Sequence, residues 1–64
     1  MIPMIANSKQ VSKAQEILKG NPSMNWDGKF GFYSNGTVVM DISWEWEKDK
    51  LYKINIDRNG NIEV

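Results

Sequence analysis

The residues of this chain that could do acid–base chemistry are carboxylates spaced two or four apart along one segment: Asp41, Glu45 and Glu47. On a β-strand this spacing turns them to the same face, where two neighbouring carboxylates can act as a general acid and a general base. The chain has no histidine and no cysteine, so any nucleophile would be a hydroxyl, an amine or a carboxylate. A polar face open to water has no concave pocket that shifts a pKa. We therefore expect no catalytic residues and no enzyme activity.

A second set of oxygen-bearing residues lies near the C-terminus: Asp57, Asn59, Gly60, Asn61 and Glu63. Calcium loops of the helix-loop-helix type have glycine at the sixth position and a carboxylate at the twelfth. Here the glycine falls at the fourth position and the sequence stops before the twelfth. Structural zinc is not expected either, because it prefers cysteine and histidine. We predict a hairpin turn at this segment and expect no metal or other cofactor.

Length and charge restrict the class of protein. Eight basic and eight acidic side chains cancel in 64 residues, whereas nucleic-acid-binding domains carry a basic excess, so we do not expect a nucleic-acid partner. The apolar segment from Met1 to Ile5 is shorter than a signal-peptide core and has no cation before it. We expect no export signal, no membrane span and a cytoplasmic location, which the lack of cysteine fits. One domain, residues 1–64, is expected at this length.

The elements that would position these residues begin with a helix from Asn7 to Lys19. Its apolar residues recur at three- and four-residue spacing and form one stripe: Val11, Ala14, Ile17 and Leu18. Asn7 is suited to cap the start, with Gln10 reaching back three residues later. Gly20, followed by Asn21 and Pro22, is suited to end it.

After Pro22 the apolar period changes to two, which predicts strands. We place them at Met24–Tyr33, Thr37–Glu47, Leu51–Asp57 and Asn61–Val64, separated by short turns. Short turns join antiparallel neighbours, so the sequence predicts an α+β fold with one N-terminal helix packed on a four-stranded antiparallel β-meander.

Strand register follows from keeping the apolar even-numbered residues on one face. A three-residue loop at Ser34–Gly36 sets Phe32 opposite Val38 and Phe30 opposite Met40, and Gly36 suits the left-handed residue of such a loop. The same reasoning with a loop at Arg58–Gly60 pairs Ile56 with Ile62 and Ile54 with Val64.

For the middle hairpin, the even-numbered faces match when Trp46 lies opposite Tyr52 and Trp44 opposite Ile54, with Lys48–Lys50 at the tip. The odd-numbered face would then hold two favourable charge pairs, Lys29 with Asp41 and Glu45 with Lys53. It would also hold one unfavourable pair, Asp41 with Asp57.

Aromatic residues on the apolar face suggest a binding surface. The helix would be about 18 to 20 Å long and the second strand roughly 34 to 37 Å, so the helix cannot cover the whole sheet. We expect the uncovered end to be Met24, Trp46 and Tyr52, rimmed by the charges of Glu45, Glu47 and Lys50. Exposed apolar patches of this kind mark interfaces. The alternative is that the arm from Met1 to Ile5 buries these rings.

The favoured hypothesis is a non-catalytic protein-interaction module that forms a homodimer, binds a larger protein, or does both. It would act through Met24, Trp46 and Tyr52, or through the carboxylates Asp41, Glu45 and Glu47. Small size and the lack of catalytic groups suit an inhibitor or regulator of a cytoplasmic target, of the type that phages and mobile elements encode.

A second hypothesis is sequestration of a small molecule of the nucleotide type, with Lys29 or Lys53 neutralising a phosphate. Over a short stretch, Trp26, Asp27, Gly28 and Lys29 resemble a Trp, polar, Gly, Lys segment of some phage proteins that sequester nucleotide signals. Single-stranded nucleic-acid binding is the least favoured, because the sheet face opposite the helix is rich in acidic residues.

Overall fold

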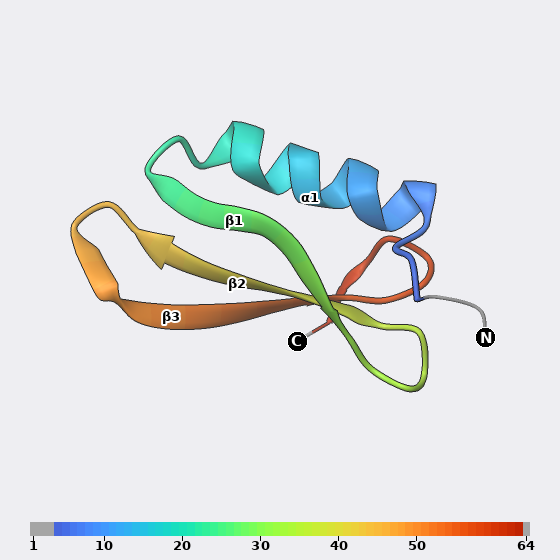
Figure 1. The fold of residues 1–64 in the computed structure, drawn as a ribbon. Helices are drawn as coiled ribbons and strands as arrows, with labels where there is room; N and C mark the ends of the chain where they lie inside the picture. The colour runs from blue at the N-terminus through green and yellow to red at the C-terminus, as the bar shows by residue number, and fades with distance from the viewer. Residues whose placement is uncertain (1–3, 64) are drawn as a thin grey trace.

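The computed structural model describes residues 4–63, and these form one helix followed by a four-stranded sheet (Figure 1). The elements are α1 (Ser8–Gly20), β1 (Met24–Phe32), β2 (Val38–Trp44), β3 (Glu47–Ile56) and β4 (Ile62–Glu63). The strands lie in the order β1-β2-β3-β4 and each pair is antiparallel. The predicted α+β fold, a helix on an antiparallel meander, is confirmed.

Helix α1 begins as the sequence predicts. The Asn7 side chain accepts a hydrogen bond from the Gln10 N–H at 2.9 Å, and the Gln10 side chain accepts one from the Asn7 N–H at 2.9 Å. The other end differs from the prediction. Gly20 is still helical, and Asn21 ends the helix by donating from its backbone N–H to the Leu18 carbonyl and from its side chain to the Ile17 carbonyl.

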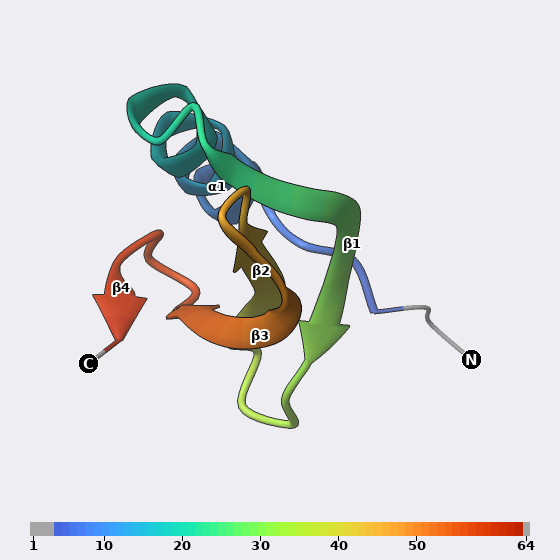
Figure 2. The ribbon, with the colours of Figure 1, turned by 90° about the vertical axis from the view of Figure 1, so that its left-hand side faces the viewer.

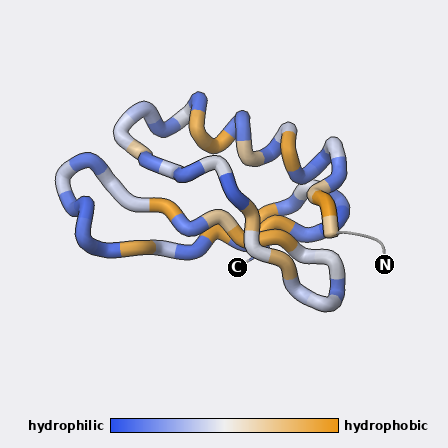
Figure 3. The backbone as a smooth tube through the Cα atoms, viewed as in Figure 1, coloured by the Kyte–Doolittle hydropathy of each residue, from blue (hydrophilic) through white to orange (hydrophobic). Residues whose placement is uncertain are grey.

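The core lies between α1 and one face of the sheet. Its buried apolar residues come from the helix, from β2 and from the end of β3: Ala14, Val38, Met40, Ile42 and Ile56. In Figure 3 the apolar segments of α1 and of the strands beneath it are coloured orange. Val11, predicted to face the core, is 37% exposed, whereas Gln10 is only 2% exposed. A polar side chain therefore occupies a core position, and its hydrogen bonds, given below, compensate for its burial.

The two outer hairpins have the predicted register. Phe32 lies opposite Val38 and Phe30 opposite Met40, and Gly36 has a φ of 91° in the turn between them. Ile56 lies opposite Ile62. The predicted pairing of Ile54 with Val64 lies outside the described residues.

Strand β1 bends sharply part-way along its length, as Figure 2 shows. The register shifts between Trp26 and Phe30, and Gly28 has a φ of 84° within this bulge. The bulge is held by its own hydrogen bonds, because the Lys29 N–H donates to Asp27 Oδ1 at 2.9 Å and Trp26 Nε1 donates to the Lys29 carbonyl at 3.0 Å. The bulge leaves Lys29 without a register partner on β2, so the predicted pairing of Lys29 with Asp41 is wrong.

The predicted register of the middle hairpin is also wrong. Tyr52 lies opposite Ile42 rather than Trp46, and Trp44 lies opposite Glu47 rather than Ile54. The turn is at residues 45–46, and four residues of β3, 48–51, bulge opposite the single residue Ser43. From Val38 to Ile42 the register differs from the predicted one by four residues, an even number that leaves the apolar residues on the same face, so alternation alone could not separate the two registers there.

The pairing of charges across the strands distinguishes the predicted register of the middle hairpin from the observed one. In the predicted register Asp41 faces Asp57, whereas in the structure it faces Lys53, whose Nζ donates to Asp41 Oδ1 at 2.9 Å. The predicted pairing of Glu45 with Lys53 is therefore replaced by an ion pair that removes the one unfavourable contact.

Strand β4 is short. It pairs with β3 only at Asn55 and Ile56, so among the described residues the outer edge of β3 from Glu47 to Ile54 has no strand beside it.

Candidate functional site

Four aromatic and aliphatic side chains belong to the β2–β3 hairpin, and we call this group the aromatic end: the half-buried Trp44 and the exposed Trp46, Leu51 and Tyr52. Trp46 is 72% exposed and Leu51 is 67% exposed. The ring of Trp46 stacks on that of Trp44, with centroids 5.1 Å apart and an angle of 10° between the planes. One face of Trp46 thus shields Trp44, which is half-buried, and much of the rest faces water.

Backbone and side-chain contacts hold this hairpin in place. The Glu45 N–H donates to the Ser23 carbonyl at 2.9 Å, which ties the turn to the connection between α1 and β1. The hydroxyl of Tyr52 donates to Glu47 Oε1 at 2.7 Å, and Lys50 Nζ lies 5.4 Å from the centre of the Tyr52 ring. The exposed rings are therefore presented by an ordered turn, which reduces the entropy lost on binding.

The structure brings together some of the predicted binding residues and separates others. Trp46 and Tyr52 belong to the aromatic end, and Glu45 and Glu47 flank Trp46 in the sequence of the hairpin. Met24 is half-buried and packs against the core, so the prediction that it lies uncovered is wrong. Asp41 lies further along β2, in its ion pair with Lys53.

Sequence reasoning missed Leu51 as an exposed apolar residue. It is an apolar side chain at an odd-numbered position, and in the predicted register that position faces water. This break in the alternating pattern was the signal that could have found it.

The aromatic end is exposed for a different reason from the predicted one. Strand β2 has seven residues and spans about 24 Å, which is close to the length of the 13-residue helix at about 20 Å. The difference in length between the helix and the second strand, which was predicted to be large, is therefore small. Trp46 is exposed because it lies in a turn, where the chain has left the face that α1 covers. Of the predicted covering arm, Met4 and Ile5 are 63% and 78% exposed, and the rest lies outside the described residues.

Two carboxylates that line one hollow already have partners. Asp27 and Asp41 both line a shallow hollow of about 410 Å³ on the sheet face opposite α1. Asp27 accepts from the Lys29 N–H, and Asp41 accepts from Lys53. This hydrogen bond, and the charge of Asp41, raise the pKa of Lys53 above its ordinary value of 10.5. Within residues 4–63 no group of three or more acidic residues is placed to hold a metal ion.

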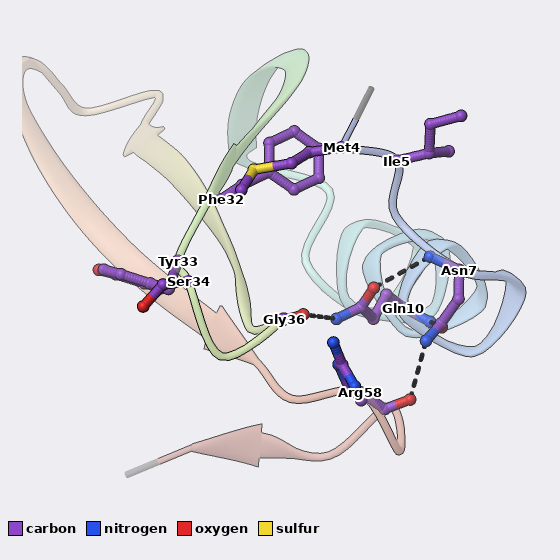
Figure 4. Close-up of a pocket in the computed structure, with 9 residues that line it drawn as sticks. All are labelled: Met4, Ile5, Asn7, Gln10, Phe32, Tyr33, Ser34, Gly36 and Arg58. Carbon is purple, nitrogen blue, oxygen red and sulfur yellow. Dashed lines mark hydrogen bonds between the residues drawn. The ribbon is translucent and has the colours of Figure 1, made fainter. Parts of the chain in front are cut away.

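A pocket of about 210 Å³ lies at the opposite end of the molecule from the Trp46 turn (Figures 1 and 4). It is formed by the start of the described chain, the start of α1, the β1–β2 turn and the β3–β4 turn. Met4 and Phe32 supply apolar wall, and Arg58 reaches in from the β3–β4 turn. Gln10 lies at the base, with Nε2 donating to the Gly36 carbonyl at 2.9 Å and to the Ile56 carbonyl at 3.2 Å.

The same segments are joined outside the pocket. Asn7 Nδ2 donates to the Arg58 carbonyl at 3.0 Å, so the start of α1 is bonded to the β3–β4 turn. The pocket walls are thus fixed to one another by side chains of the first helical turn and its cap.

Comparison with protein-family models, with curated proteins and with solved structures gives no significant match. In the part of the chain that the structure describes, α1 is too short and too polar to cross a membrane. The candidate sites therefore rest on geometry alone.

Proposed function

We propose that this chain is a non-catalytic binding domain that attaches to a protein surface through the aromatic end. The observation that carries this proposal is the exposure of Trp46, which is 72% accessible although its ring is held in a stack against Trp44. Tryptophan and tyrosine are enriched among the residues that contribute most to binding energy at interfaces. A held, exposed indole fits that pattern, and the same hairpin also exposes the tyrosine Tyr52.

Charges around the rings support a second copy of the chain as one partner. The hairpin carries Glu45, Glu47 and Asp49 together with Lys48 and Lys50, so both signs occur within one turn and its flanks. In a two-fold contact each surface meets its own copy, and a patch of mixed sign can then pair its carboxylates with the lysines of the other copy. A uniformly charged patch would repel itself.

A larger protein target is the other partner that this surface fits. An apolar centre with a charged rim is the usual composition of an interface, whoever the partner is. The size of the chain and the absence of histidine and cysteine suit a regulator or inhibitor that acts by occupying a surface.

The test is sedimentation velocity of the purified protein and of Trp46→Ala over a range of concentrations. The wild type is expected to dimerise and the variant to dissociate about thirtyfold more readily, because truncating a central tryptophan costs about 2 kcal/mol or more. Tyr33→Ala is the matched control. Tyr33 is an exposed aromatic residue, 43% accessible, and it follows the end of β1, in the β1–β2 turn and away from the β2–β3 hairpin. It should dimerise like the wild type.

The same variants separate the two partners. A monomeric wild type would remove the dimer but leave a larger target, which capture on immobilised wild-type protein would detect and Trp46→Ala would lose. If the wild type is monomeric and Trp46→Ala captures the same proteins as the wild type, the aromatic end is not a docking surface.

A further inference from the structure

The pocket at the far end from Trp46 contains one charged side chain. Of the residues that line it, Arg58 alone is ionised at neutral pH, and the others are apolar, aromatic or neutral polar groups. The pocket therefore carries a positive charge beside apolar wall, and no carboxylate in its lining balances that charge.

Arg58 has no ionic partner in the described part of the chain. The ion pairs of residues 4–63 are Lys13 with Glu16 and Lys53 with Asp41. The neighbouring carboxylate, Asp57, instead accepts from the backbone N–H groups of Asn59 and Asn61 at 2.9 and 3.0 Å. The guanidinium thus keeps its hydrogen-bond donors for another acceptor, and its planar fork matches a carboxylate or a phosphate.

The β1–β2 turn leaves room for this guanidinium because residue 36 is glycine. A Cβ at Gly36 would meet Arg58 Nε and would lie 2.8 Å from Arg58 Cζ. Gly36 also has a φ of 91°, a conformation that side chains disfavour. The bare backbone therefore lets the arginine lie against the turn and inside the pocket, as Figure 4 shows.

Apolar side chains line the pocket together with the Arg58 guanidinium. Phe32 is 39% exposed and Met4 is 63% exposed, so both offer surface to a ligand. The base of the pocket is already satisfied, because each Gln10 side-chain atom that can hydrogen-bond does so within the protein. Recognition is thus left to the Arg58 cation, to the hydroxyl-bearing side chains Tyr33 and Ser34 and to apolar contact.

We propose that this pocket binds a small organic anion, with Arg58 holding its carboxylate or phosphate and Phe32 and Met4 packing on a single ring or short aliphatic body. The volume of about 210 Å³ sets the size, because pockets for larger ligands enclose roughly 300 to 1,000 Å³. A whole nucleotide exceeds it. The cation is Arg58, not the Lys29 or Lys53 predicted from the sequence for a phosphate, and Lys53 is held by Asp41.

Four probes test the proposal by titration into ¹⁵N-labelled protein, followed by amide chemical shifts: benzoate, phenyl phosphate, inorganic phosphate and benzyl alcohol. Benzoate or phenyl phosphate should move the amides of Gly36, Arg58 and Phe32 together, and the better of the two identifies the anionic group. Inorganic phosphate lacks the ring and benzyl alcohol lacks the charge, so both should bind more weakly.

Substitution of the cation supplies the second measurement. Arg58→Gln should weaken the better anion about tenfold to a hundredfold, the usual contribution of hydrogen bonds to a charged group. Arg58→Lys should recover part of the affinity, because it keeps the charge without the planar fork. Lys19→Gln is the matched control: it removes one positive charge from the last turn of α1, outside the pocket, and should leave affinity unchanged.

The proposal is overturned if none of the four probes shifts these amides, or if Arg58→Gln binds the anions as well as Lys19→Gln does. Equal affinity for benzyl alcohol and benzoate would also overturn it, because the pocket would then be an apolar hollow that ignores charge. The amide spectrum of each variant without ligand shows whether it is folded. A failed dimer at the aromatic end would leave these outcomes untouched, since the two sites share no residue.

Discussion

Replacing Gln10 with alanine removes a side chain that joins three segments far apart in the sequence. Its Nε2 donates to the carbonyl oxygens of Gly36 and Ile56, and its Oε1 accepts from the N–H of Asn7, at distances of 2.9, 3.2 and 2.9 Å. The residue is 2% exposed. The bond to the Ile56 carbonyl is fully buried and the other two are partly buried, so the substitution leaves at least one buried polar atom without a partner.

The loss can be worked from these contacts. Three hydrogen bonds at about 1 kcal/mol each, together with one buried methylene at about 0.8 kcal/mol, give an upper figure of about 4 kcal/mol. Partial rehydration of the Gly36 carbonyl lowers it, so we expect a loss of about 2 to 4 kcal/mol in the free energy of unfolding. A domain of 64 residues has about 3 to 10 kcal/mol in all. The variant should therefore lose a large share of its stability, and at the lower end of that range it would be close to unfolding.

Gln15→Ala is the matched control, since it makes the same chemical change at an exposed position of the same helix. It should alter stability by less than about 0.5 kcal/mol. Urea unfolding of both variants, followed by tryptophan fluorescence, gives the comparison at equal slope. If Gln10→Ala unfolds at the same urea concentration as Gln15→Ala, the buried amide does not stabilise the fold.

Four further substitutions test smaller features. Asn7→Ala should lower the free energy of unfolding by about 1 kcal/mol, because the capping box is lost, and loss of helical circular dichroism at lower urea would report it. Gly36→Ala should cost about 1 to 2 kcal/mol, since alanine must adopt a φ of 91°. Gly20→Ala, in the helix with open space around it, should instead gain about 0.5 to 1 kcal/mol, and an equal response of the two glycines would contradict this. The pKa of Lys53 is raised above 10.5 by its hydrogen bond to Asp41, so the ion pair stabilises the fold below that pH and is lost as the pH rises through the raised pKa. The difference in urea midpoint between wild type and Lys53→Met should therefore be present at neutral pH and shrink in strong alkali.

Local sequence signals predicted the parts of the fold that local chemistry decides. The start of α1 follows from Asn7 and Gln10, which are three residues apart. The outer hairpins follow from the apolar residues at even-numbered positions, together with Gly36 and Gly60. These glycines have φ values of 91° and 82°, which few other residues adopt. The middle hairpin has no glycine in its turn, so its register was predicted from the alternation of apolar residues, and the unfavourable pairing of Asp41 with Asp57 was the remaining signal against that register.

Contacts between distant segments explain what the sequence could not predict. Gln10 was interpreted as a cap alone, yet its amide also binds carbonyls 26 and 46 residues away. The pocket beside Arg58 is likewise assembled from four segments. Neither feature has a periodic or local signature, because the partners meet only after the sheet has formed.

The open outer edge of β3 has a consequence for solubility. An unpaired strand edge is a template on which other chains can polymerise into fibrils. Here the edge is interrupted by the bulge at residues 48–51 and carries lysines at positions 48, 50 and 53. Bulges and lysines at an edge act as gatekeepers against such growth. Acetylation of these lysines removes their charge and should therefore make this edge more prone to start amyloid-like assembly.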